Sequence, residues 1–531
     1  MVGVPGKSKG CSTCRRRKKG CDQKRPICGQ CASSGNVCGG YKRDRTFILH
    51  PASKAVEKAI FLPYTRTIVA PLPGSLNQTA VQAQCRSLFW DLYMPQGDCA
   101  CRDAFLIRCG HPMNWAELIQ DVPRQDNALE EAFSALTISR VGQANKDVRL
   151  VRESSRIYGR ALKELQEALF DPKRMYSDHT LMACMLLGLY EVFEGPAFRS
   201  RSWLTHAAGA ARLVQLRGPE RHQHWEAHHP FLASRIPTVY ASILQRKSTY
   251  LATEEWLTIP WVKMGHRTYF DRLTDTTTLI PGFLEKLDIL RESDSDIGQD
   301  LIQLLDDCKT VQVTLDKWRD GTKKGATPRV QRHDPNDTDG YPFETDLWFE
   351  NHLFVHARVV YYACSLTLAE LGDDIMQALE LREHKLPESM NPTLLKDILN
   401  AERYASNICR TVPYCLQPDM GAWGANIINF PANLAYFYYQ RIRRSDATRW
   451  LENAFERVKQ RGVHAEHVFN ELLFRLREKE EPNFHLKRES STETTESGGT
   501  PGSVPSLSTT ATTFIYEDPS KAYYNASNDP D

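Results

Sequence analysis

Six cysteines near the start of the chain constrain its folding more than any other feature. They form two copies of the spacing C-x2-C-x6-C, with each cysteine of the second copy 17 residues after its counterpart: Cys11, Cys14, Cys21, Cys28, Cys31 and Cys38. In each copy the first two thiols can share one face of a helical turn, and the third can return on an extended stretch. Since the segment has almost no apolar side chains to bury, a bound metal must supply its folding energy.

The number of thiols limits how zinc can be bound. Zinc takes four tetrahedral ligands, so one ion would leave two of the six thiols unused and two separate sites would need more thiols than the segment has. Six thiolates hold two ions only if two of them bridge, and Cys11 and Cys28 are the symmetric choice because each leads its copy. The alternatives are a single-zinc ribbon, built from the first two cysteines of each copy, and a disulfide knot.

A block of five cations follows Cys14 directly: Arg15, Arg16, Arg17, Lys18 and Lys19. Residues 1–50 contain 12 basic and 2 acidic side chains, whereas the rest of the chain contains 55 basic and 63 acidic ones. This asymmetry predicts a polyanion-binding head on an acidic body. We expect the block to lie on the helix that the metal fixes, where cations can meet phosphates and guanine edges. The block also matches a nuclear-localisation run.

The absence of a signal-peptide-like segment in the first residues predicts the cellular compartment. The first fourteen contain no apolar segment of the kind found in signal peptides, so we expect reduced thiols and an intracellular, soluble protein. The longest apolar run, residues 181–190, is too short to span a bilayer, so no membrane partner is expected.

The cysteine spacing and the adjoining cations resemble the fungal Zn2Cys6 binuclear cluster, the DNA-binding module of fungal transcription regulators. The resemblance implies two Zn2+ ions shared by the six cysteines, with the first and fourth bridging. It also implies that the end of the first helix enters the major groove at a CGG-type triplet, where Arg17 and Lys18 read bases and Arg15 contacts phosphate. Gly20 departs from the family, which often has Lys or Arg immediately before the third cysteine.

The predicted domains are a cluster at residues 1–46, a linker at 47–80, a helical body at 81–480 and a tail at 481–531. Four prolines interrupt the linker, and its apolar spacing is too short for a coiled coil. The tail is rich in Ser and Thr and should be disordered. Its segment "FIYED", residues 514–518, has the aromatic and acidic groups of short activation segments that dock on coactivators.

The body shows helical periodicity and no clear alternating strand pattern, which predicts an all-α domain. Helices are expected over residues 147–170, from about 202 to the stop at Gly218-Pro219, and over about 346–371 and 449–478. A second resemblance, to the fungal-specific transcription factor domain, lies in the second of these regions: Trp203, His206, Gly209, Ala210, Leu213, Arg217 and Gly218. It implies that the body is a regulatory domain that senses a ligand or dimerises.

The remaining motifs favour simple interpretations. The C-x-C and C-x-H spacings of Cys99, Cys101, Cys109 and His111 are unusual for zinc, so we expect reduced thiols there. A solvated loop is expected at residues 334–340, and a polar loop at four histidines before Pro230: His222, His224, His228 and His229. The nucleophile-elbow, zinc-peptidase and dinucleotide motifs are absent from the sequence, which predicts a protein that is not an enzyme.

Together these features predict a nuclear, sequence-specific regulator that binds duplex DNA at CGG-type half-sites. The resemblance favours an activator of RNA polymerase II promoters with a pathway-specific role, such as control of a secondary-metabolite gene cluster. Because one triplet gives too little specificity in a genome, a second half-site, a homodimer or another partner is required. The alternative is a zinc-dependent RNA-binding or protein-interaction module.

Overall fold

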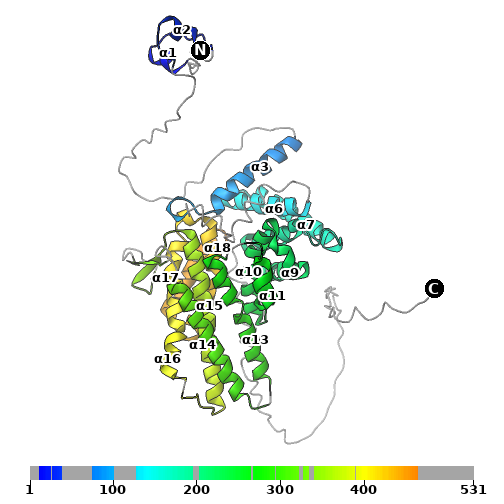
Figure 1. Cartoon of the computed structure of the whole chain (residues 1–531), viewed down its shortest axis with the longest axis vertical. Helices are drawn as coiled ribbons and strands as arrows, with labels where there is room; N and C mark the ends of the chain where they lie inside the picture. Colours follow the sequence, from blue (N-terminus) through cyan, green and yellow to red (C-terminus); the bar gives the residue numbers. More distant parts are fainter. Residues whose placement is uncertain are drawn as a thin grey trace, which may run out of the picture. The chain divides into compact units, whose positions relative to one another are not determined.

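The computed structural model describes residues 11–24, 27–38, 74–100, 127–194, 202–264, 267–293, 295–321, 327–333, 340–388 and 390–463. These residues form a small cysteine-rich module and a helical body, and each is described by itself (Figure 1). The predicted tail, its "FIYED" segment and residues 47–73 of the predicted linker lie outside the described residues. Helix α3 (Gly74–Tyr93) begins within the last part of that predicted linker.

The module contains α1 (Ser12–Arg16) and α2 (Gly29–Ser33). After α3, the longer helices of the body are α6 (Asn127–Ala144), α7 (Val148–Phe170), α8 (Asp178–Glu194), α9 (Ser202–Arg217), α10 (Trp225–Gln245), α12 (Tyr269–Thr277), α13 (Ile280–Arg291), α14 (Gly298–Asp320), α15 (His352–Leu381), α17 (Ala401–Cys415), α18 (Gly421–Arg441) and α19 (Ser445–Gln460). Shorter helices are η1 (Gly97–Cys99), η3 (Pro219–Gln223), η4 (Tyr250–Ala252), α11 (Glu254–Thr258), η5 (Ile259–Trp261), α16 (Pro392–Ile398) and η7 (Pro418–Met420).

The prediction of a small cluster module and a predominantly helical body is confirmed, with one addition. Strands β1 (Arg329–Arg332) and β2 (Thr345–Trp348) form a two-stranded antiparallel sheet in which Arg329 pairs with Trp348. The two strands lie beside α17 (Figure 1). The Arg410 side chain of α17 donates to the Thr345 carbonyl at 3.0 Å.

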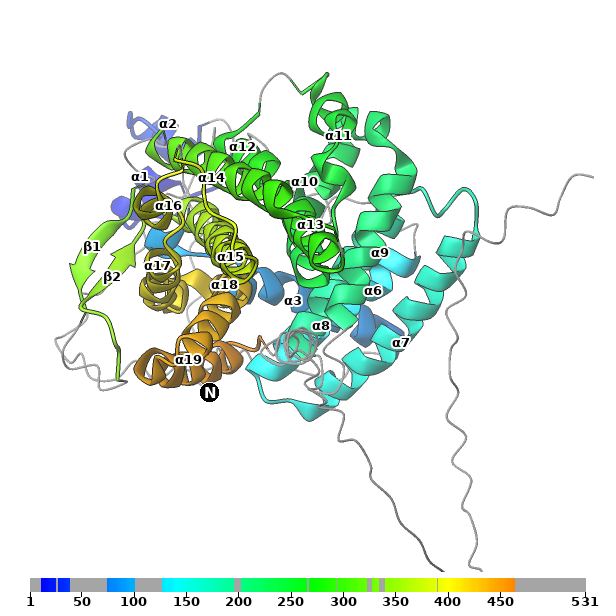
Figure 2. The ribbon, with the colours of Figure 1, turned by 90° about the horizontal axis from the view of Figure 1, so that it is seen from below.

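Helix α15 is the central element of the C-terminal part of the body. It contacts α14, α17 and α18, and Figure 2 shows these helices closer to end on. Its long run of buried side chains explains this position, because a helix that is apolar on most faces must be surrounded by neighbours. In the N-terminal part α8 lies against α6 and α9, and α10 contacts both α8 and α9. Among the described residues, no helix is long and apolar enough to cross a membrane.

Two helices agree closely with their sequence patterns. Helix α7 occupies residues 148–170, in agreement with the helix predicted over 147–170, and buries Ile157, Ala161 and Leu165. Asp147 caps it, because its side chain accepts from the Arg149 backbone N–H at 3.0 Å. Helix α9 ends at Arg217, immediately before the predicted stop at Gly218-Pro219.

Two predictions about the body were wrong. The helix expected from residue 346 begins only at His352, because Thr345–Trp348 pairs as a strand and Asn351 caps the helix by accepting from the Leu353 N–H at 3.1 Å. The histidines expected in a polar loop lie on η3 and α10 or between them, and three of them are buried: His222, His228 and His229.

Two of the buried histidines, His222 and His228, bond to backbone carbonyls in place of solvent. The Nδ1 atom of His222 bonds to the Ala227 carbonyl at 3.0 Å, and that of His228 bonds to the His222 carbonyl at 2.7 Å. Burial lowers the pKa of His222 to about 3 and that of His228 to about 4, so both imidazoles are neutral at physiological pH. The predicted solvated loop at residues 334–340 lies almost entirely outside the described residues.

Candidate metal centre and nucleic-acid interface

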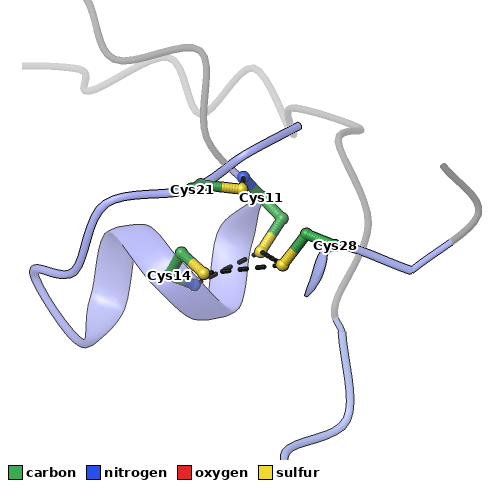
Figure 3. A group of neighbouring side chains, drawn as sticks. All are labelled: Cys11, Cys14, Cys21 and Cys28. Atoms are coloured by element: carbon green, nitrogen blue, oxygen red, sulfur yellow. Dashed lines mark hydrogen bonds between the residues drawn. The ribbon is translucent and has the colours of Figure 1, made fainter. Parts of the chain in front are cut away.

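The six cysteine sulfurs of the module form two four-membered groups. One group contains Cys11, Cys14, Cys21 and Cys28, and the other contains Cys11, Cys28, Cys31 and Cys38. Within each group all ligand atoms lie within 4.8 Å of one another, and the two groups share Cys11 and Cys28. Figure 3 shows the first group, with the Cys11 and Cys28 sulfurs facing each other.

The sulfur separations fit tetrahedral zinc. With Zn–S bonds of about 2.3 Å, the edge of a ZnS4 tetrahedron is about 3.8 Å. The Sγ atoms of Cys11 and Cys28 are 3.6 Å apart, those of Cys14 and Cys28 are 3.6 Å apart, and those of Cys11 and Cys31 are 3.8 Å apart. Each group can therefore surround one ion, and the two shared sulfurs lie where both ions can be reached.

The backbone of each half supports its leading sulfur in the same way. The Cys14 N–H donates to the Cys11 sulfur at 3.3 Å, and the Cys31 N–H donates to the Cys28 sulfur at 3.4 Å. In each half the leading cysteine precedes a five-residue helix and the second cysteine lies on it. The two shared sulfurs thus have the same local surroundings, as the sequence repeat predicts.

The sulfurs are removed from water together. Cys11, Cys14, Cys28 and Cys31 are buried, with Cys21 and Cys38 partly buried against them. Burial raises the pKa of the Cys14 thiol to about 12 and also raises the pKa of Cys28 and Cys31. A thiolate in this position needs a cation, and a coordinated metal ion supplies it.

Besides the contacts among the sulfurs, hydrogen bonds of three polar side chains link the two halves of the module. The Thr13 hydroxyl on α1 donates to the Val37 carbonyl at 2.9 Å. The Asp22 carboxylate accepts from the Gly29 N–H at the start of α2, at 2.9 Å.

The third link joins the cationic block to the second half, because Arg17 Nη1 donates to Ser34 Oγ at 2.9 Å. The roles of Thr13, Asp22 and Ser34 were not predicted from the sequence. The only signal that could have found them is their polarity inside a segment without an apolar core.

The cationic block is only partly helical, which corrects the expectation that it rides on one helix. Helix α1 ends at Arg16, and Arg17 and Lys18 lie in the turn that follows. The turn is closed by a hydrogen bond from the Lys19 N–H to the Cys14 carbonyl at 3.0 Å. Arg17, Lys18 and Lys19 are exposed, whereas the side chains of Arg15 and Arg16 lie outside the described ones. The turn thus presents three cations to solvent next to the buried sulfurs.

Other candidate metal ligands do not assemble among the described residues. Within that part of the chain, the clusters of three or more His, Cys, Asp or Glu side chains placed to hold an ion all lie in the cysteine module. Cys99 is buried in the body, and its predicted companions Cys101, Cys109 and His111 lie outside the described residues.

Comparison with known proteins identifies both parts of the chain. The fungal Zn(2)-Cys(6) binuclear cluster domain matches residues 9–46, and the fungal specific transcription factor domain matches residues 131–379. The cysteine group is therefore placed to bind the two zinc ions of such a cluster.

An uncharacterized protein of Emericella nidulans is 27% identical to this chain over 186 residues, which is 34% of this chain and 38% of the relative. The alignment thus spans well under half of the relative's length. No solved structure matches the chain.

Proposed function

We propose that this chain, which belongs to the fungal Zn2Cys6 transcription regulators because it contains both of their domains, activates transcription by reading CGG-type triplets in duplex DNA. One observation carries the proposal: two four-sulfur groups that share Cys11 and Cys28 lie directly beside an exposed turn of cations. In this proposal the six cysteines hold two Zn2+ ions, and the ions replace the hydrophobic core that the module lacks.

The chemistry of the turn favours the major groove of DNA. Guanine presents O6 and N7 as acceptors there, and Arg or Lys can address both atoms. In the proposal Arg17 and Lys18 make these base contacts, while Arg15, Arg16 and Lys19 bind phosphates. Arg17 is held by Ser34 at 2.9 Å, so its guanidinium is partly oriented before DNA arrives. A bidentate contact of this kind discriminates between bases by roughly 1–3 kcal/mol.

The proposed domains divide the work between DNA binding and regulation. Residues 1–46 bind DNA, residues 47–80 link the domains, residues 81–480 form the regulatory body and residues 481–531 recruit coactivators. Both matched domains indicate a regulatory rather than a catalytic protein, and they imply action in the nucleus. Since one triplet is a short site, the proposal includes a homodimer that reads two half-sites.

Selection from a random pool of duplexes tests this proposal. The full-length protein is loaded with zinc, bound duplexes are recovered and sequenced, and a chelator-treated sample is the control. Enrichment of paired CGG-type triplets at one spacing, only in the zinc-loaded sample, is the expected result. Enrichment of single triplets would remove the homodimer from the proposal. No enrichment, together with binding to single-stranded RNA, would instead favour the alternative of an RNA-binding module.

Activation needs its own readout. A reporter gene behind the selected sites should be expressed more strongly when the full-length chain is present, and the increase should be lost when residues 481–531 are removed. A decrease in reporter expression would identify a repressor and leave the DNA-reading part of the proposal intact.

A further inference from the structure

The helical body contains a cavity of about 210 Å³. Its lining residues come from α3, α8, α9, α10, α15 and α18, so it lies where helices from the N-terminal and C-terminal parts of the body meet. Helices α8 and α9 approach closely at its edge, because a Cβ atom on Gly188 would lie 3.1 Å from the Cβ of His206. Met185, Leu189 and Trp203 are partly exposed, which gives the cavity a rim on the α8–α9 side.

Aromatic side chains form several parts of the cavity wall. Trp203 lies on α9 and Trp423 on α18, and both line it. Tyr240 and Phe430 form another part of the wall, where their rings stack with centroids 3.8 Å apart. Flat aromatic walls of this kind favour a flat aromatic guest, because offset stacking and edge contacts add to the burial of apolar surface.

The cavity carries no formal charge. Among the described residues that line it, none is Asp, Glu, Lys or Arg. Its two histidines do not supply a cation either, because burial lowers the pKa of His206 to about 4 and that of His356 to about 3. A charged ligand would lose its hydration without gaining a counter-charge, so the cavity selects against ions.

Two prolines leave hydrogen-bond acceptors at the wall. Pro237 in α10 has no N–H, so the carbonyl of Ala233, four residues earlier, lacks its normal helical donor. In the same way, Pro431 in α18 has no N–H, so the carbonyl of Ile427 lacks its normal helical donor. Ala233 and Ile427 both line the cavity. Two helices therefore offer backbone acceptors in the region where a ligand would lie.

We propose that this cavity binds an uncharged aromatic molecule of roughly ten non-hydrogen atoms that carries one hydroxyl or N–H donor. The size follows from the volume, since an apolar cavity of about 150 Å³ accommodates benzene. The aromatic walls favour the ring, the absence of charge among the described lining residues excludes ionised ligands, and the proline-freed carbonyls select for a donor. The ligand would contact helices from both ends of the body and stabilise their packing.

A series of three naphthalenes tests each part of this proposal on the full-length protein. 2-Naphthol has the ring and a donor, 2-methoxynaphthalene has the ring without a donor, and 2-naphthoate carries a charge at pH 7. Titration calorimetry should show saturable one-to-one binding of 2-naphthol, with a rise in the unfolding temperature of the body. 2-Methoxynaphthalene should bind about 2-fold to 10-fold more weakly, as expected for one lost hydrogen bond, and 2-naphthoate should bind most weakly.

A matched pair of variants on α9 locates the site. Ala207 is buried and lines the cavity, whereas its neighbour Ala208 is exposed. Ala207→Leu should fill part of the cavity and weaken 2-naphthol binding about 10-fold or more, whereas Ala208→Leu should leave binding unchanged. Met185→Ala is a second variant, which should enlarge the cavity and strengthen binding of the larger 2-anthrol relative to the wild-type chain.

Several outcomes would overturn the proposal. These are the absence of saturable 2-naphthol binding, equal binding of all three naphthalenes, or unchanged binding in a folded Ala207→Leu chain. If Ala207→Leu does not fold, the naphthalene series on the wild-type chain and the Met185→Ala variant still test whether the cavity binds the proposed ligand. None of these measurements involves DNA. A failure of the ligand proposal therefore leaves the proposed recognition of CGG-type triplets intact, and a failure of DNA recognition leaves the ligand proposal intact.

Discussion

Lys18 and Gly35 occupy equivalent positions in the two halves of the cysteine module, and both have a positive φ, 53° and 63° respectively. In each half the turn closes by a hydrogen bond to the second cysteine: Lys19 N–H to the Cys14 carbonyl and Asn36 N–H to the Cys31 carbonyl, both at 3.0 Å. Glycine adopts this conformation readily, whereas lysine does so at a cost. The half that carries the cations thus keeps a strained lysine where the other half has glycine.

Lys18→Gly should therefore weaken DNA binding without lowering the stability of the module. The substitution removes about 1 kcal/mol of backbone strain, so the zinc-loaded module should resist unfolding at least as well as the wild type. Binding to the selected duplex should fall by roughly 1–3 kcal/mol because a base contact is lost. Fluorescence anisotropy with selected and scrambled duplexes measures the loss. An equal fall on both duplexes would identify Lys18 as a phosphate contact instead.

Arg15 and Lys18 should differ in how they respond to salt. If Arg15 contacts phosphate, Arg15→Ala should weaken binding to the selected and the scrambled duplex alike. It should also reduce the slope of log K against log salt concentration by about 1. Lys18→Ala should weaken binding to the selected duplex more than binding to the scrambled one. Affinities measured over a range of salt concentrations give both quantities, and identical behaviour of the two variants would contradict the assigned roles.

Loss of a sulfur that belongs to only one of the two groups should release zinc from the module. In Cys21→Ser one ion loses a ligand, and the shared sulfurs Cys11 and Cys28 then lose part of their support, so zinc content and DNA binding should both fall. Cys308→Ser is the control, because Cys308 is a buried cysteine on α14 that belongs to neither sulfur group. Elemental analysis per chain measures the zinc. Full zinc content and normal DNA binding in Cys21→Ser would refute the six-cysteine assignment.

The buried histidines should make the body sensitive to acid. The pKa of His228 is about 4 in the folded chain and near 6.5 when unfolded, so protons bind preferentially to the unfolded chain. The stabilisation is complete above about pH 6.5 and declines as the pH falls toward 4, with about 1–2 kcal/mol lost per such histidine at pH 5.

His228→Asn can preserve the donor to the His222 carbonyl without titrating, so urea unfolding should show a smaller loss of stability between pH 7 and pH 5. His224→Asn, at an exposed position, is the control and should lose stability as the wild type does. An unchanged acid response in His228→Asn would contradict the role given to its burial.

Local signals in the sequence predicted some elements well. The C-x2-C-x6-C repeat limited the possible metal arrangements, because the number and spacing of thiols leave few ways to satisfy tetrahedral zinc. Helix α7 and the end of α9 were also predicted correctly, since an apolar stripe and a Gly-Pro pair act over a few residues.

Other features depend on distant residues and could not be predicted. Strand β1 is exposed along its whole length and has no alternating pattern, so only its pairing with β2 defines it. Pro230 suggested a loop, but the structure places it inside α10, whose packing buries His228 and His229. The cavity brings together α3 and α18, which are far apart in the sequence, and no local pattern indicates it.

The most direct test of the central claim is a zinc titration that follows DNA binding. Full-length protein is stripped with a chelator, and Zn2+ is added back in the presence of the selected duplex. If two ions share Cys11 and Cys28, specific binding should rise to a plateau at two equivalents of zinc per chain. A plateau at one equivalent would indicate the single-zinc ribbon, and binding that does not depend on zinc would contradict the cluster as the DNA reader.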